Sequence, residues 1–327
     1  MRVLITGGAG FIGSHLAEAY LQRGDEVYIL DDLSTGTLEN LRPLQEHEPY
    51  SKRLFVTIDT VLHADKTLEL VGTCDTVVHL AAAVGVQYIL DNPLTSIMTN
   101  VRGAETILEI CHKFKKKVLI ASTSEVYGMQ NHAPLKETDY CVYGPSIKSR
   151  WSYAASKLID EFTALAYYRT KQLPVVIVRL FNTVGPRQTW RYGMVLPRFV
   201  KQALAQQPIT VYGDGTQTRT FTHVNDVTAA LVALLDAPEA LGQVVNVGGM
   251  EEVSILHLAE RVKAKAGSTS DIKCIPYSDV YPKDFEDMQR RVPSTDKLKQ
   301  LIGYAPRMNL DQILEDTIAY YRSGPGC

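Results

Sequence analysis

Short apolar runs alternate with helix-length amphipathic segments through the first 180 residues of the chain. The runs are rich in Val, Ile and Leu on both faces, which is typical of strands in a parallel sheet covered by helices on both sides. The sequence therefore predicts a doubly wound α/β fold. The predicted strands are Val3–Thr6, Glu26–Leu30, Leu54–Ile58, Thr76–Leu80, Lys117–Ala121 and Val175–Arg179.

The composition of the chain changes after Arg179. Gly, Pro and Arg become more frequent, and short elements follow one another without a linker. We expect a sheet domain over residues 1–180, to which strands from about 221–248 return, and a smaller, interleaved lobe over residues 181–327. The elements predicted in this half are helices near 195–206 and 254–266, and strands at Phe221–His223 and Val244–Val247.

A glycine-rich stretch, V-L-I-T-G-G-A-G-F-I-G-S-H-L, joins the first predicted strand to a helix. Gly7 can form the turn, Gly10 lets the backbone approach a pyrophosphate at the helix N-terminus, and Gly13 lets helix and strand pack closely. The second strand ends in Asp31 and Asp32, where a carboxylate binds the ribose hydroxyls of NAD and repels the 2′-phosphate of NADP. The sequence therefore predicts a Rossmann-type NAD site, which also includes Phe11 and Ile12 of the loop.

Polar side chains end two further predicted strands. Asp59 and Thr60 follow the third strand, where Asp59 either contacts the adenine of the cofactor or is a solvated acid. The stretch S-T-S-E-V-Y-G places Thr123, Ser124 and Glu125 at the tip of the fifth strand. A carboxylate there belongs either to a polar loop in water or to a reaction site in which it is an acid or a base.

Tyr153 and Lys157 lie four residues apart in S-Y-A-A-S-K, within a segment that predicts a long helix to about Arg169. At this spacing the two side chains share one face of the helix. An ammonium, together with the positive nicotinamide of a bound cofactor, lowers the pKa of a phenol from its usual ~10. Tyr153 is therefore a candidate base for a substrate hydroxyl.

Charge and cysteine content exclude several classes of function. A formal net charge of -2 gives no overall field that would attract nucleic acid or an acidic membrane. No apolar run approaches the ~20 residues that span a bilayer. The five cysteines are scattered without a C-x-x-C pair, which argues against a disulfide framework or a structural zinc site. We expect a cytoplasmic protein with no metal and with neither a nucleic-acid nor a membrane partner.

Six motifs follow one another along nearly the whole chain: T-G-G-A-G-F-I-G, V-V-H-L-A-A, S-T-S-E-V-Y-G, Y-A-A-S-K, R-L-F-N-T-V-G-P-R-Q and V-Y-G-D-G-T-Q-T-R. In this order they resemble the extended short-chain dehydrogenase/reductase family, and within it the nucleotide-sugar epimerases, dehydratases and decarboxylases. The resemblance implies a tightly held NAD that is reduced and reoxidised within one catalytic cycle. It also implies a nucleoside-diphosphate sugar as substrate, which we expect to be a UDP-sugar and which is bound by the smaller lobe.

The resemblance further implies a homodimer, in which the helix of Tyr153 and the helix near residues 95–112 form a four-helix interface. Four residues of the first helix recur at helical spacing, which suits either such an interface or an ordinary buried face. These residues are Leu158, Phe162, Leu165 and Ala166.

The same resemblance assigns site residues to roles. The catalytic hydroxyl, tyrosine and lysine of the family match Thr123, Tyr153 and Lys157. Positions that line or order the cofactor site match Leu80, Ala81 and Asn100. The expected substrate-binding residues are Asn182, Arg187, Val195, Tyr212, Arg219 and Arg291. Guanidinium forks suit diphosphate oxygens, although a surface ion pair is the alternative for any single arginine.

Two residues separate the possible reactions. Every branch begins with removal of the sugar 4-OH proton and transfer of the C4 hydride, after which a plain 4-epimerase needs no further acid or base. The epimerases typically carry small neutral residues where this chain has Ser124 and Glu125. The stretch Y-P-K-D-F-E-D-M-Q-R-R-V-P-S-T-D-K resembles the decarboxylases, in which an arginine before a proline approaches the sugar carboxylate. Arg291 matches that arginine best; Arg290 is the alternative, and both could instead contact the diphosphate.

The sequence thus predicts decarboxylation of UDP-glucuronate to UDP-xylose or to the UDP-4-keto-pentose. Arg291 would grip the carboxylate, while Ser124 and Glu125 would position it or relay the returning proton. The alternatives are a 4-epimerase of a UDP-hexose or UDP-hexuronate, and then a nucleotide-sugar 4,6-dehydratase. A non-catalytic NAD(H) sensor is disfavoured because Tyr153 and Lys157 are both present.

Overall fold

The computed structural model of the protein describes residues 1–130, 132–191, 193–281 and 286–324. Within them, the central sheet has seven parallel strands in the order β11-β6-β5-β4-β1-β2-β3. The chain starts in the middle and winds outward to each edge in turn, which confirms the predicted doubly wound fold. The strands are β1 (Arg2–Thr6), β2 (Glu26–Asp31), β3 (Leu54–Ile58), β4 (Thr76–His79), β5 (Lys117–Thr123), β6 (Val175–Leu180) and β11 (Val244–Val247).

The predicted strands of the sheet lie within two residues of their observed bounds, and the largest difference is at the end of β5. This strand runs on to Thr123 because Ser122 and Thr123 continue the pairing with Arg179 and Leu180 of β6. The polar residues therefore extend the strand instead of ending it. Their side chains are delivered from a rigid element.

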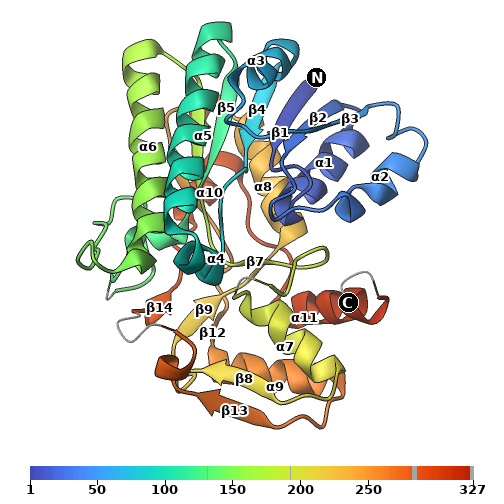
Figure 1. Ribbon diagram of the computed structural model, residues 1–327, viewed down its shortest axis with the longest axis vertical. Helices are drawn as coiled ribbons and strands as arrows, with labels where there is room; N and C mark the ends of the chain where they lie inside the picture. Colours follow the sequence, from blue (N-terminus) through green and yellow to red (C-terminus); the bar gives the residue numbers. More distant parts are fainter. Residues whose placement is uncertain (131, 192, 282–285, 325–327) are drawn as a thin grey trace.

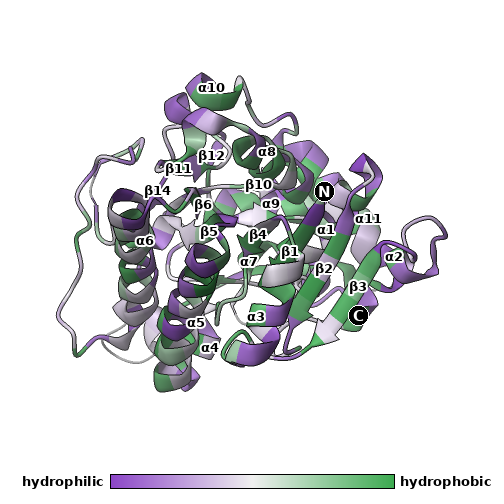
Figure 2. Ribbon diagram, turned by 90° about the horizontal axis from the view of Figure 1, so that it is seen from above, coloured by the Kyte–Doolittle hydropathy of each residue, from purple (hydrophilic) through white to green (hydrophobic). Residues whose placement is uncertain are grey.

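Helices cover both faces of the sheet. On one face lie α1 (Phe11–Arg23), α2 (Arg42–Glu46), α8 (Val224–Asp236) and α10 (Asp296–Ile302), and on the other α3 (Ala64–Thr73), α5 (Pro93–Phe114) and α6 (Ser152–Lys171). In β1, Ile5 joins the core that contains Leu16 of α1, whereas its neighbour Leu4 joins the opposite core with Ile107 of α5. Figure 2 shows the apolar strands lying between the two helical layers. Burial on both faces explains why the strands read as continuous apolar runs.

A smaller lobe lies at the bottom of Figure 1. Its core joins Phe199, Leu258 and Ile313 of three helices, α7 (Val195–Leu204), α9 (Ile255–Ala266) and α11 (Leu310–Arg322). The chain visits the lobe before and after β11, so the two parts interleave; the boundary near residue 180 stays a prediction. The strand pairs are β8 (Ile209–Tyr212) with β13 (Ile272–Ile275), β7 (Thr183–Val184) with β10 (Thr222–His223), and β9 (Thr218–Thr220) with β12 (Glu252–Ser254) and β14 (Arg290–Arg291).

Short helices complete the described structure. They are α4 (Val86–Asp91) and the 3-10 turns η1 (Leu38–Asn40), η2 (Ser124–Tyr127), η3 (Ser149–Trp151), η4 (Pro238–Ala240) and η5 (Tyr277–Asp279). Of the helices in the described ranges, none combines the length and the apolar character needed to cross a bilayer. Residues 282–285, which belong to the stretch that predicted a decarboxylase, lie outside the described residues.

Candidate active site

A cavity of about 570 Å³ lies where the carboxyl ends of the sheet strands meet the smaller lobe. The sheet contributes the glycine loop and strand ends, and the lobe contributes α7, β8, β9 and β14. Doubly wound sheets bind their ligands at this edge. Most of the predicted site residues line the cavity, namely Gly7, Gly10, Phe11, Ile12, Gly13, Asp31, Asp32, Asp59, Leu80, Ala81, Thr123, Ser124, Glu125, Tyr153, Lys157, Asn182, Val195, Tyr212, Arg219 and Arg291.

The glycine loop leaves room only for backbone. Gly7 adopts a φ of 71°, and a Cβ there would stand 2.8 Å from the amide nitrogen of Ala81. A Cβ on Gly13 would stand 2.2 Å from the carbonyl oxygen of Gly7, so helix α1 could not pack against the loop. A Cβ on Gly10 would meet only that same oxygen, at 3.1 Å. The space in front of Gly10, at the N-terminus of α1, fits the pyrophosphate of a dinucleotide.

Asp31 has a structural task in addition to its place in the cavity. Its carboxylate accepts hydrogen bonds from the amides of Ala9 and Leu33, both at 2.9 Å. Burial raises the pKa of Asp31 despite these bonds. The side chain therefore ties the glycine loop to the end of β2, and Asp32 beside it accepts a bond from the amide of Ser34 at 3.0 Å.

Three predicted residues are not among those that line the cavity. Asn100 orders the wall from behind, because its Oδ1 accepts a hydrogen bond from the amide of Ala83 at 2.8 Å. The Thr60 hydroxyl accepts a bond from the amide of Leu62. Arg187, expected at the diphosphate, instead forms an ion pair with Glu18 of α1 at 2.6 Å.

Helix α6 brings Tyr153 and Lys157 into the cavity beside Thr123 of β5. The Lys157 ammonium has a charged partner of its own. It donates to Asp160, one turn along the helix, at 2.7 Å. The pKa of Tyr153 is raised, first by burial and then by the negative charge of Glu125, while a hydrogen bond from Thr123 acts in the opposite direction. The surroundings of Tyr153 in this structure therefore favour the protonated phenol.

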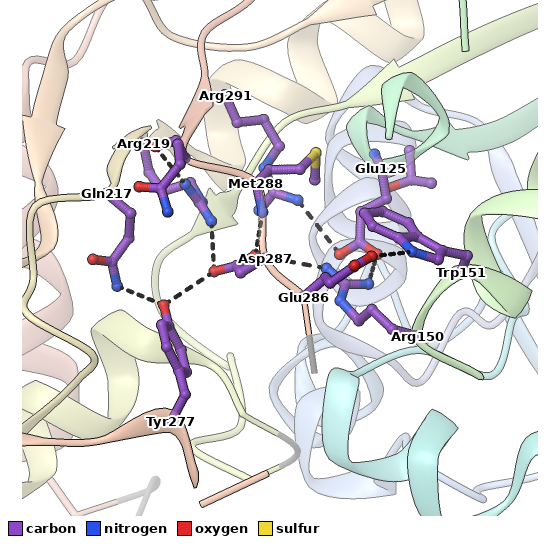
Figure 3. Close-up of polar contacts among 12 residues, drawn as sticks. Glu125, Arg150, Trp151, Gln217, Arg219, Tyr277, Glu286, Asp287, Met288 and Arg291 are labelled. Carbon is purple, nitrogen blue, oxygen red and sulfur yellow. Dashed lines mark hydrogen bonds and ion pairs between the residues drawn. The ribbon is translucent and has the colours of Figure 1, made fainter. Parts of the chain in front are cut away.

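Glu125 is held between two arginines (Figure 3). Arg150 donates to its Oε2 at 2.5 Å and Arg291 to its Oε1 at 3.4 Å. The side chain is only 15% exposed, and burial opposes its ionisation, but the two guanidiniums outweigh burial and lower the pKa of Glu125 to about 2. Glu125 is therefore a buried carboxylate anion that faces the cavity, and the solvated-loop alternative is wrong.

The two candidate arginines, Arg290 and Arg291, form strand β14 and point in opposite directions. Arg291 faces the cavity and donates to Oδ1 of Asn182 at 2.5 Å. Its neighbour Arg290 points away, because successive side chains of a strand alternate, and binds both oxygens of Glu252 at 2.7 Å. The structure thus places Arg291, and not Arg290, at the cavity.

Among the described residues, Arg291 belongs to a charged cluster with more guanidiniums than carboxylates. Among its described members, the guanidiniums of Arg150, Arg219 and Arg291 face the carboxylates of Glu125 and Asp287. Burial, together with the charge of Arg219, lowers the pKa of Arg291 to about 10. The Nε–H of Arg291 is buried without a hydrogen-bond partner among these residues. An anionic group in the cavity would satisfy both the charge and the donor.

The family model of GDP-mannose 4,6-dehydratase matches residues 4–317 of the chain. The chain belongs to this family. Membership confirms the resemblance to nucleotide-sugar enzymes that the motifs indicated.

Several relatives of the chain are named for UDP-sugars. The chain is 40% identical to the UDP-N-acetyl-alpha-D-glucosaminuronate decarboxylase of Bacillus cytotoxicus, over 98% of each protein. It is 34% identical to UDP-glucuronic acid decarboxylase 1 of Danio rerio, over 98% of this chain and 72% of that protein. Its structure is similar to that of UDP-glucuronic acid 4-epimerase from Bacillus cereus in complex with UDP-glucuronic acid and NAD, with a TM-score of 0.88, 30% identity and 99% coverage of both chains.

Two charged residues at the site of this dehydratase-family member escaped the sequence prediction. Arg150 lies three residues before Tyr153, a spacing that places both on one side of the start of α6. Asp287 precedes Arg291 by four residues and binds Arg219 at 2.9 Å and Arg150 at 4.0 Å. The spacing was a usable signal for Arg150. Asp287 carried none, because its partners come from distant parts of the chain.

Proposed function

We propose that the chain is an NAD-dependent decarboxylase of a UDP-linked hexuronate. The product would be UDP-xylose or the UDP-4-keto-pentose when the substrate is UDP-glucuronate. The observation that carries the proposal is the position of Arg291, which faces the same cavity as Tyr153. Its buried Nε–H has no hydrogen-bond partner among the described residues. The named decarboxylases at 34–40% identity support it.

The residues present fit NAD. The loop around Gly10 would hold the pyrophosphate, the acids at the end of β2 would bind the ribose hydroxyls of the adenosine, and Lys157 would lie next to the reactive end. When bound, NAD would accept the hydride from C4 of the sugar and return it, and would add a positive ring next to the phenol.

Tyr153 and Thr123 would remove the proton from the 4-OH of the sugar. The resulting C4 ketone makes the C6 carboxylate a β-keto acid, so breaking the C5–C6 bond releases CO2 and leaves its electron pair on an enolate. A proton then adds to C5. Arg291 would hold the carboxylate during binding, because a guanidinium fork matches its two oxygens.

The charge state of Glu125 sharpens its role. With a pKa of about 2 it remains ionised at neutral pH and has no proton to donate. Of the two roles predicted from the sequence, the contacts therefore support positioning. Glu125 orients Arg150 and Arg291 around the place of the sugar carboxylate.

A second substrate, UDP-N-acetylglucosaminuronate, is favoured by one observation. The relative at 40% identity carries that sugar in its name, whereas the named glucuronate decarboxylases lie at 32–34%. The two sugars differ only at C2, and the carboxylate chemistry is the same for both. We therefore propose both as substrates to be compared directly.

The test is to incubate the purified enzyme and NAD with UDP-glucuronate, UDP-N-acetylglucosaminuronate and UDP-glucose separately. Products are followed by NMR, and CO2 release is measured. We expect CO2 from at least one uronate and none from UDP-glucose, which has no C6 carboxylate. Inversion at C4 with all carbons retained would instead identify a 4-epimerase, and loss of water from C5 and C6 a 4,6-dehydratase.

We also propose that the enzyme is a cytoplasmic homodimer. The described cysteines are free thiols, in keeping with a reducing compartment. Phe162 and Ile159 of α6 are 62% and 50% exposed, and Leu94 of α5 is 72% exposed. Leu158 and Leu165 instead pack against the core of their own chain. The exposed apolar residues of α5 and α6 favour a helical interface with a second copy.

A further inference from the structure

Lys157 is paired with an acid that has no assigned role. Asp160 lies three residues along α6, and its Oδ2 accepts a hydrogen bond from the Lys157 ammonium at 2.7 Å. The side chains are 3% and 1% exposed, so both charges are removed from water. Either charge alone at this depth would cost several kcal/mol, and each is therefore tolerated because of the other.

Asp160 serves the lysine and not the general structure of the helix. The next residue, Glu161, binds Arg179 with both oxygens and Ser122 with one of them, and so ties α6 to β5 and β6. Among the described residues, Asp160 binds Lys157 and no strand residue. Its second oxygen, Oδ1, is buried without a hydrogen-bond partner among the described residues. Only Lys157 of the pair lines the cavity.

The remaining charges near Tyr153 come from three other elements. Glu125 of η2 is anionic, and Arg150 of η3 is already bound to it. His79 of β4 faces the lysine but is neutral, because burial lowers its pKa to about 3. Arg150 is among the charges that lower the pKa of Tyr153, and Asp160 is among those that raise it. Lys157 lines the same cavity as Tyr153, one helical turn away, with its ammonium bound to Asp160.

We propose that Asp160 is a positioning residue for the reaction: its carboxylate holds the Lys157 ammonium at the floor of the cavity and offsets its charge, so that the lysine alone does not ionise Tyr153. When bound, the positive ring of the cofactor would supply the charge that makes Tyr153 a base. The sugar hydroxyl would therefore be deprotonated only in an enzyme that holds the oxidised cofactor. The inference rests on the proposed function only in taking Tyr153 as the base.

The experiment measures ionisation of Tyr153 without substrate or turnover. Near-ultraviolet absorbance is recorded against pH for each variant and for the same variant with Tyr153→Phe, and the difference isolates this tyrosine. We expect Asp160→Asn to lower the pKa of Tyr153 by about one unit or more, because an uncompensated ammonium then faces the phenol. Asp160→Glu, which keeps the carboxylate, should restore most of the original value.

A double variant distinguishes the proposed positioning role of Asp160 from a purely structural role. It also avoids leaving the Lys157 ammonium buried and unpaired. In Asp160→Asn with Lys157→Met, we expect the pKa of Tyr153 to stay within about 0.5 unit of the wild type, since a neutral pair replaces an offset pair. A rise of a unit or more would show that Lys157 acts on the phenol despite Asp160 and would overturn the proposal. So would an unchanged value in Asp160→Asn. Neither result depends on which sugar the enzyme accepts.

Discussion

Glu125 is a buried side chain whose environment reverses the usual effect of burial. Apolar surroundings raise the pKa of a carboxyl group, but Arg150 and Arg291 lower that of Glu125 from 4.5 to about 2. A carboxyl group with a lowered pKa stabilises the folded state above its ordinary pKa, and this contribution is lost as the pH falls through the folded value. The relevant window is from about pH 4.5 down to about pH 2.

Stability against pH tests this charge state. Glu125 should contribute about 3 kcal/mol above pH 5 that disappears between about pH 4.5 and 2. Urea unfolding of the wild type should therefore show a steeper loss of stability over this window than Glu125→Gln, which cannot ionise. Equal slopes would mean that Glu125 is not held as an ion.

The same substitution should affect turnover more than cofactor binding. In Glu125→Gln, Arg150 and Arg291 lose the anion that orients them, so we expect at least about a tenfold fall in kcat. NAD binding, measured by fluorescence titration, should stay within about twofold, because the Glu125 carboxylate binds Arg150 and Arg291 and not the glycine loop. Unchanged turnover would remove Glu125 from the working site.

Arg290 and Arg291 form a matched pair for testing the carboxylate grip. Arg291→Lys should lower kcat/KM for the uronate at least about tenfold, since an ammonium cannot replace a planar fork. Arg290→Lys should change it less than about twofold, because this side chain binds Glu252 on the far face of β14. Equal losses in the two variants would contradict the assignment.

At the residue scale, the motifs identified the cavity-lining groups but not their pairing. Tyr153 and Lys157 were found from their spacing, yet the spacing could not show that Asp160 binds the ammonium. Asp160 and Glu161 look alike in sequence, and only packing assigns one to Lys157 and the other to Arg179. Which of two adjacent acids binds which base depends on how each side chain is buried, and the sequence alone does not show this.

At the element scale, two glycines of the loop serve different purposes: Gly13 allows the helix to pack, and Gly10 leaves space for the cofactor. A Cβ on Gly13 collides with the Gly7 carbonyl, whereas a Cβ on Gly10 meets that oxygen at 3.1 Å and otherwise stands in open space. Gly13→Ala should therefore lower the unfolding free energy by about 2–4 kcal/mol, as overpacking does. Gly10→Ala should cost less than about 1 kcal/mol but weaken NAD binding at least about tenfold. Thermal unfolding and NAD titration of both variants test this; the opposite ranking would refute it.

Elements with a strong local pattern were predictable, and elements defined by distant pairing were not. The strands of the main sheet have continuous apolar runs and were located closely. Strand β14 has two residues and exists only because it pairs with β9, some 70 positions earlier, as in Arg291↔Arg219. No local signal separated Arg290 from Arg291, since their opposite directions follow from that pairing.

At the scale of the whole molecule, the exposed apolar residues of α5 and α6 predict the assembly. Sedimentation should give twice the chain mass of 36.3 kDa for the wild type. Phe162→Glu should give a monomer, because it places a charge in the apolar patch. Tyr140→Glu, at an aromatic that is 86% exposed but outside these helices, should remain dimeric. A monomeric wild type would refute the proposed interface.

The position of β11 in the sheet has a consequence for how the protein is made. This strand covers the edge of β6, yet it follows the first visit of the chain to the smaller lobe. A nascent chain that stops before Val244 would expose the apolar edge of β6, which is a site for aggregation. The sheet domain and the smaller lobe are therefore not independent units that can be produced separately or exchanged between relatives. The proposed carboxylate site is complete only after Arg291 has left the ribosome.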